Sequence, residues 1–112
     1  MEPLRRRADF EQVFLSGAFV RGRTVSLRIL ERSEGPTRVG LAVGKRLDKR
    51  AVIRNRVRRR LREALRRFEL RDGYDVVVIA RRSALTDAAP ALREDVARVC
   101  GKAGLLGGED SG

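Results

Sequence analysis

The amino-acid sequence predicts one domain that mixes helices with strands, the α+β class. Three observations favour this class. Two segments alternate apolar with polar residues, as half-buried strands do, and three others repeat apolar residues at helical spacing. The run YDVVVIA is almost continuously apolar, which is typical of a central strand covered on both faces. A chain of 112 residues is long enough for one self-standing core.

The first predicted element is a short helix over residues 9–16. Asp9 followed by Gln12 fits a capping box, in which each side chain accepts from a free backbone N–H of the first turn. Gly17 follows at once, and glycine commonly ends a helix. We therefore expect the helix to begin at Asp9 and to end before Gly17.

Two strands are predicted next, over residues 24–31 and 38–45. Each alternates apolar with polar or small residues, and the turn-forming segment 33–37 separates them. The sequence therefore predicts a hairpin. One face of its second strand is almost without side chains, so another backbone could come close there. That face consists of Gly40, Ala42 and Gly44.

The following element, over about residues 49–69, is an amphipathic helix of unusual charge. Between Arg50 and Arg67 there are nine arginines and one acidic residue, Glu63, a balance of +8 within a chain of net charge +11. Apolar residues recur at spacings of three and four, which predicts one buried side. They are Val52, Ile53, Val57, Leu61, Ala64, Leu65 and Phe68.

The C-terminal part of the chain completes the domain. Residues 74–80 form the predicted central strand, and residues 88–103 form a second amphipathic helix that tolerates Pro90 in its first turn. Residues 104–112 are rich in glycine and acidic residues, so we expect a disordered tail. The domain is therefore assigned to residues 1–103.

The charge of the chain predicts a polyanionic partner. There are 26 Lys and Arg residues against 15 Asp and Glu, and the pI is about 11.5. Nucleic acid is the first candidate and an anionic membrane surface the second. An ordinary solvated helix face is the alternative, but Arg54, Arg58 and Arg62 lie one turn apart and repel one another. Phosphates bound by this face would relieve the repulsion, and arginine binds them bidentately.

Three residues carry two interpretations each. Asn55 lies among the arginines and has donor and acceptor groups that could read a base, or it is a polar helix residue without a specific role. Phe10 and Phe14 lie one turn apart and form either core or a base-stacking platform. The spacing of these residues does not decide between the two interpretations of each.

The sequence has no recognisable catalytic constellation. It contains no histidine, which removes imidazole acid–base catalysis and the common zinc sites. It has no phosphate-binding loop motif and no serine nucleophile elbow. The single cysteine, Cys100, lies on an apolar stripe, so we expect it to be a buried core residue.

The expected location is the cytoplasm. No apolar run approaches the roughly 18 residues that a membrane-spanning helix needs. The first ten residues, MEPLRRRADF, have no apolar signal-peptide core. We therefore expect no membrane partner.

Four segments in order resemble the protein subunit of bacterial ribonuclease P. They are DFEQVF (9–14), RVGLAVGKR (38–46), AVIRNRVRRRLREAL (51–65) and YDVVVIAR (74–81). The sequence Arg54-Asn55-Arg56 is similar to the signature of that family. The resemblance implies an αβββαβα sandwich in which the basic helix forms a left-handed crossover between parallel strands. Such crossovers are nearly always right-handed, so physical reasoning alone would not predict this handedness.

The resemblance also implies a function. In that family a catalytic RNA subunit with bound Mg²⁺ removes the 5′ leader from precursor tRNA, and the protein assists without supplying catalytic residues or needing an obligate protein partner. The basic helix contacts the RNA subunit, and a cleft between this helix and the sheet holds the leader. The implied RNA-subunit contacts are Lys45, Arg46, Arg54, Arg56, Arg59 and Arg62. The implied leader contacts are Phe10, Phe14, Ser26, Arg28 and Asn55.

The sequence differs from the family pattern at one position, and three alternative functions are still to be decided. Some family members have an aromatic residue where this chain has Arg28, so a cation contact would replace stacking. The alternatives are a general RNA-binding or ribosomal protein, a nonspecific DNA-binding protein and a self-sufficient nuclease. The lack of catalytic motifs argues against the nuclease.

Overall fold

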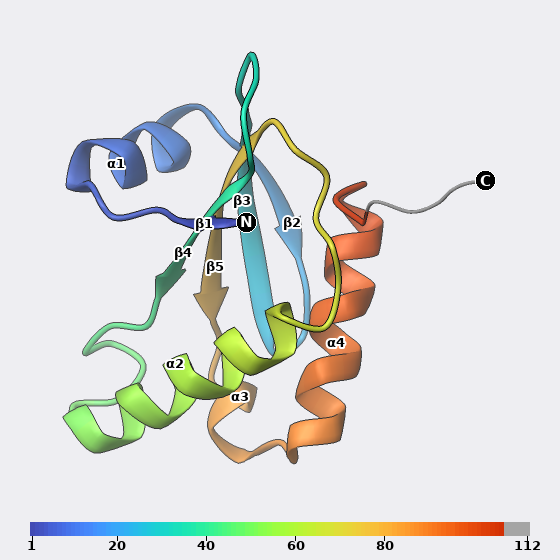
Figure 1. The fold of residues 1–112 in the computed structure, drawn as a ribbon. Coiled ribbons are helices and arrows are strands. Elements are labelled where there is room, and N and C mark those ends of the chain that lie inside the picture. The colour runs from blue at the N-terminus through green and yellow to red at the C-terminus, as the bar shows by residue number, and fades with distance from the viewer. Residues whose placement is uncertain (107–112) are drawn as a thin grey trace.

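A five-stranded sheet forms the centre of the fold in a computed structural model that describes residues 1–106 (Figure 1). The strand order is β1-β4-β5-β3-β2, and β5 pairs in parallel with β4 and antiparallel with β3. β5 is therefore the central strand, as predicted. In chain order the elements are β1 (Glu2–Pro3), α1 (Arg7–Ser16), β2 (Ala18–Arg21), β3 (Val25–Glu31), β4 (Arg38–Ala42), α2 (Ala51–Leu65), β5 (Tyr74–Ala80), α3 (Ser83–Thr86) and α4 (Ala89–Lys102).

Helices cover both faces of the sheet (Figure 1). α2 and α4 pack on one face over the larger core, which contains Val25 and Leu27 of β3. α1 packs on the opposite face, where Val13 meets Val77 of β5. This confirms the implied αβββαβα order, to which β1 and the short α3 are added. Parallel pairing of β4 with β5 also confirms that α2 is a crossover helix.

The predicted hairpin is wrong, because β5 lies between β3 and β4. Alternation identifies a strand but not its partner. The backbone N–H of Arg32 donates to the carbonyl of Gly73 at 2.7 Å, and that of Gly73 donates to the carbonyl of Gly35 at 2.9 Å. These bonds hold the connecting segment across the end of β5. At its other edge, β3 pairs antiparallel with β2. This strand has only four residues, too few to show an alternating pattern in the sequence.

The predicted N-terminal cap of the first helix needs correction. α1 begins at Arg7, and its N-cap residue Arg6 makes no side-chain capping bond. Asp9 is in the first turn, where its carboxylate lies 3.5 Å from the guanidinium of Arg38 in β4. The capping box therefore does not form, because the Asp9 carboxylate faces a cation of the sheet.

The basic helix is shorter than predicted, and its apolar side is buried only from its second turn. Val57 and Leu61 are buried, but Val52 is 68% exposed. In Figure 1 the first turn of α2 extends beyond the edge of the sheet. The loop before α2 is held by Leu47, which packs against the core, and by polar contacts.

The domain extends beyond the predicted boundary at residue 103. Gly104 has a φ of +75°, and its N–H donates to the carbonyl of Gly101 at 3.0 Å. The N–H of Leu105 donates to the carbonyl of Cys100 at 3.0 Å, and the Leu105 side chain is fully buried. This is a Schellman motif, in which glycine turns the chain back so that the next residue packs on the helix. The remaining part of the predicted tail, residues 107–112, lies outside the described residues.

A buried carboxylate links the second amphipathic helix to the sheet. Asp95 of α4 is 1% exposed and accepts hydrogen bonds from the backbone N–H of Thr24 at 2.6 Å, from the Thr24 hydroxyl and from Arg98. Burial opposes its ionisation, but these hydrogen bonds outweigh that effect and hold the pKa of Asp95 below its usual value. Asp95 therefore fixes α4 against the start of β3.

Candidate nucleic-acid interface

Local polar contacts order the loop that precedes α2. The backbone N–H and the side chain of Arg50 both donate to Asp48, and these bonds lower the pKa of Asp48 to about 2. Arg54 donates to the backbone carbonyls of Asp48 at 3.1 Å and of Lys49 at 2.7 Å. The loop that carries Lys45 and Arg46 is thereby tied to the helix that follows it.

Arg58 connects α2 to the sheet. Its guanidinium donates to the carbonyl of Val43 at 2.9 Å, just after β4, and to the side-chain oxygen of Asn55 at 2.8 Å. Asn55 is exposed, and its amide N–H groups have no acceptor within residues 1–106. Arg58 is not among the predicted contacts, although its spacing of four from Arg54 and Arg62 is visible in the sequence.

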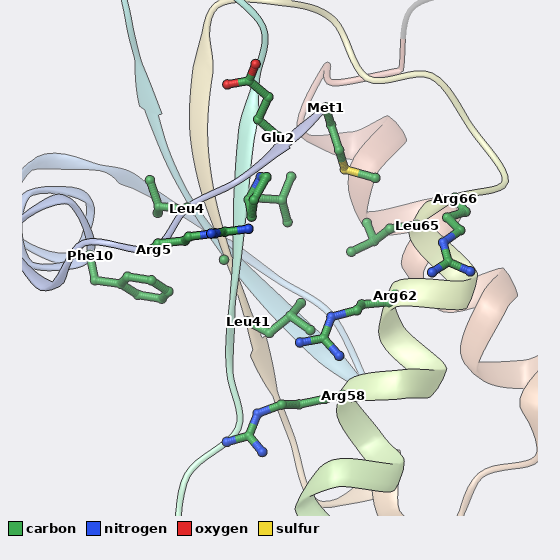
Figure 2. Close-up of a pocket in the computed structure, with 13 residues that line it drawn as sticks. Met1, Glu2, Leu4, Arg5, Phe10, Leu41, Arg58, Arg62, Leu65 and Arg66 are labelled. Atoms are coloured by element: carbon green, nitrogen blue, oxygen red, sulfur yellow. The ribbon is translucent and has the colours of Figure 1, made fainter.

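A groove of about 590 Å³ lies beside β4, between α2 and the N-terminal segment that carries β1. Figure 2 shows Arg58, Arg62 and Arg66 along one side of it and Phe10 on the other. We call it the edge groove. The residues that define it here are Arg5, Phe10, Gly40, Leu41, Arg58, Arg62 and Arg66.

A second groove, of about 500 Å³, continues around the ends of β4 and β5. Leu41 and Arg58 line both grooves, so the two are adjacent. Here called the loop groove, it is defined by Leu41, Ala42, Gly44, Arg46, Arg58, Ile79, Arg81 and Arg82. Arginines from four segments of the chain thus surround these two adjacent depressions.

Phe10 and Phe14 have different surroundings. A Cβ atom at Gly40 would lie 2.3 Å from the end of the Phe10 ring, so the ring rests directly on the glycine. The expectation of a bare strand face is therefore wrong at Gly40, because an aromatic ring rather than a backbone fills the space. Phe14 is 43% exposed and lies in the last turn of α1. Of these two rings, Phe14 leaves more of its surface free for stacking.

Arg28 and Phe19 form a pair on neighbouring strands of the face that α1 covers. They lie opposite each other in the β2–β3 register, and the guanidinium lies 5.0 Å from the centre of the ring. Arg28 also donates to the carbonyl of Gly17, the C-cap of α1, at 3.4 Å. Phe19 is 48% exposed, so β2 provides an aromatic surface beside the position where Arg28 stands. Ser26, two residues before Arg28, is only 3% exposed and lies beneath the surface.

The implied cleft between the helix and the sheet needs correction. Val57 and Leu61 of α2 fill that space with core, and the groove opens at the edge of β4 instead. Phe10 reaches the edge groove, whereas Phe14, Ser26, Arg28 and Asn55 do not line either groove. The predicted leader contacts therefore occupy the α1 side of the sheet and the first turns of α2, not one cavity.

The predicted RNA-subunit contacts divide into two groups. Arg54 is half-buried and bonded to the loop, as described above. The other five are exposed, and within residues 1–106 none of their side chains has a hydrogen bond or an ion pair with the protein. They are Lys45, Arg46, Arg56, Arg59 and Arg62. These cations can bind an external anion.

The possible metal ligands and the cysteine are spread over the described residues. Among residues 1–106 no three His, Cys, Asp or Glu side chains gather where they could hold a metal ion. Cys100 is buried as predicted, and burial raises the pKa of its thiol to about 11, so it is a poor nucleophile. None of the helices in this part of the chain is long and apolar enough to span a bilayer.

Comparison with known families decides among the remaining alternatives. The model of the family named Ribonuclease P matches residues 1–104. The chain belongs to the ribonuclease P protein family. The ribonuclease P protein component of Symbiobacterium thermophilum is 45% identical over 92% of this chain and 91% of its own length. That of a Pseudanabaena species is 39% identical over 94% and 93%.

Solved structures show the same fold. The ribonuclease P protein of Thermotoga maritima superposes with a TM-score of 0.81 at 25% identity, covering 91% of this chain and 97% of that one. A Staphylococcus aureus ribonuclease P protein mutant with defective mRNA degradation activity superposes with a TM-score of 0.84 at 24% identity, covering 93% and 89%. The chain is thus the protein component of a ribonucleoprotein endoribonuclease that processes tRNA. The family implies an RNA subunit and a tRNA substrate as partners.

Proposed function

We propose that this chain binds the ribonuclease P RNA with the exposed side of α2 and binds the 5′ leader of precursor tRNA beside α1. The observation that carries this proposal is the set of exposed cations without a partner within residues 1–106, of which Arg62 lines the edge groove opposite Phe10 and Arg46 lines the loop groove. The proposed RNA-subunit contacts are Lys45, Arg46, Arg54, Arg56, Arg59 and Arg62. The proposed leader contacts beside α1 are Phe10, Phe14 and Arg28, with Ser26 beneath them, and Asn55 of α2 is a further proposed leader contact that lies apart from these.

The catalytic groups of the reaction are assigned to the RNA. We propose that the RNA subunit also holds most of the Mg²⁺, as the family resemblance implies, since RNA phosphates supply the oxygen ligands that Mg²⁺ prefers. The protein's arginines lower the repulsion between the RNA subunit and the substrate, which raises affinity for precursor tRNA and for Mg²⁺. This activity acts on newly made tRNA, so we also propose a cytoplasmic location.

Reconstitution tests the proposal. We expect cleavage of precursor tRNA by the ribonuclease P RNA at low Mg²⁺ concentration to become faster when the protein is added. The protein alone should cleave nothing. Cleavage that is unchanged by the protein would favour a general RNA-binding or ribosomal role, and cleavage by the protein alone would favour a nuclease.

The leader site is tested by Phe14→Ala. Removal of the ring should weaken binding of leader-bearing precursor tRNA by about 1–3 kcal/mol, the usual contribution of one base–aromatic stack, and should leave binding of mature tRNA unchanged. Leu15→Ala is the matched control, because Leu15 is adjacent and 83% exposed but carries no aromatic ring. Equal losses for both tRNA forms would argue that Phe14 acts by supporting the fold.

A further inference from the structure

A third groove lies on the other side of α2 from the edge groove. It has a volume of about 230 Å³ and is formed where α2 packs beside α4 (Figure 1). We call it the α2–α4 groove, defined by Arg59, Arg60, Glu63 and Arg67 with Leu92 and Arg93. Four of these six side chains carry guanidinium groups.

The charges of this groove are not balanced by the residues that the structure describes. Glu63, its one carboxylate, lies 3.7 Å from the guanidinium of Arg66 outside the groove. Arg60 donates to the backbone carbonyl of Asp87 at 2.9 Å, which leaves most of its N–H groups unused. Arg59, Arg67 and Arg93 have no hydrogen bond or ion pair to any residue in 1–106.

Three arginines elsewhere in the molecule pair with carboxylates. Arg38 forms a bidentate pair with Asp75, Arg23 pairs with Asp87, and Arg98 pairs with Asp95. The fold thus places carboxylates beside other arginines, but in the α2–α4 groove four arginines accompany a single carboxylate, that of Glu63. A concave surface of one charge sign focuses its potential, so a bound anion would gain more here than on a flat face.

The shape of the groove indicates an extended polyanion. Arg60 and Arg67 lie seven residues apart along α2 and the turn that follows it, which is about 10 Å at the helical rise. Arg93 approaches from α4, so the cations come from both walls. Such an arrangement suits neighbouring phosphates of one strand, since arginine binds each phosphate bidentately. In that case the arginines on the two sides of α2 contact different stretches of polyanion.

We propose that the α2–α4 groove binds a stretch of RNA sugar–phosphate backbone separate from the RNA at the edge groove, and that Arg93 is an RNA-contact residue. α2 therefore lies between two RNA segments, and α4 is part of the interface. The inference rests on the proposed function, because the RNA is that of ribonuclease P.

Charge reversal at Arg93 tests this inference. Arg93→Glu is expected to lower the affinity for ribonuclease P RNA at least tenfold at 0.1 M salt and to reduce the slope of log affinity against log salt by about 0.7–0.9 for each phosphate that is no longer bound. Lys102→Glu is the matched control, because Lys102 is an exposed cation of the same helix that donates to Arg21 on the opposite flank. Thermal unfolding of both variants checks that each is folded. A third variant, Arg93→Lys, keeps the positive charge and should retain part of the affinity that Arg93→Glu loses.

Two outcomes separate this inference from the proposed function. If Arg93→Glu and Lys102→Glu bind the RNA equally, with equal salt slopes, the groove is not an RNA site, and an acidic protein segment becomes the candidate occupant. In that case stimulation of cleavage by the unaltered protein still supports the proposed function. If the unaltered protein neither binds the RNA nor stimulates cleavage, the proposed function fails, and this inference fails with it.

Discussion

Replacing Arg56 and Arg62 together by alanine is expected to weaken binding of the ribonuclease P RNA roughly 50-fold at 0.1 M salt. Each bound phosphate contributes about 0.7–0.9 to the slope of log affinity against log salt, so removing one arginine–phosphate interaction costs about five- to eightfold at this concentration. Both side chains are exposed and lack a protein partner within residues 1–106. Their removal should therefore leave the fold intact. The measurement is a binding titration at several salt concentrations.

A second double variant controls for the change in net charge. Arg21→Ala with Lys102→Ala removes two cations at the opposite edge of the sheet, where Lys102 donates to the carbonyl of Arg21. We expect its RNA affinity to fall much less. Similar decreases for the two double variants would mean that the protein attracts RNA by total charge and not through α2.

Asp95→Ala is expected to lower the free energy of unfolding by about 3 kcal/mol. The change leaves the backbone N–H and the hydroxyl of Thr24 without their acceptor, and an unsatisfied buried donor costs about 1–3 kcal/mol. It also releases α4 from the start of β3. Urea unfolding at neutral pH measures the decrease. Glu94→Gln is the control, since Glu94 is the exposed neighbour on the same helix.

The effect of Asp95 on stability should depend on pH. Because its pKa is lower in the folded protein, the folded state binds fewer protons than the unfolded state near the unfolded pKa of about 3.9. The contribution of Asp95 to the free energy of unfolding is therefore complete at pH values above the unfolded pKa, and it is lost as the pH falls through the folded pKa. The stability difference between the unaltered protein and Asp95→Asn should shrink below about pH 4. A difference that is constant with pH would contradict this assignment.

Periodicity predicts the faces of the main elements well. Val25 and Leu27 are expected on one side of their strand and are buried beneath α2 and α4. The run at residues 74–80 is expected at the centre and is β5. Each of these predictions depends on side-chain direction within one element, which local sequence determines. The hairpin prediction fails because strand pairing depends on residues far apart in the chain.

The sequence predicts which types of residue form the site but not how these residues are arranged in space. Five of the six proposed RNA-subunit contacts are exposed and have no partner within residues 1–106, but Arg54 is bonded to the loop before its helix. Phe10 lies on Gly40, and Phe19, opposite Arg28, provides the aromatic surface next to the position where other family members have one. No spacing in the sequence brings these residues together, since each pair joins two different elements.

The sequence by itself determined the class of the fold, the basic side of α2 and the family. The first two follow from patterns within single segments, because the burial of each helix or strand depends on its own periodicity, and the family follows from four motifs in order along the chain. Only the tertiary structure decided that the grooves open at the edge of β4 and between α2 and α4. Concavity arises where separate elements pack, and whether an arginine is paired depends on which carboxylates the fold brings near it.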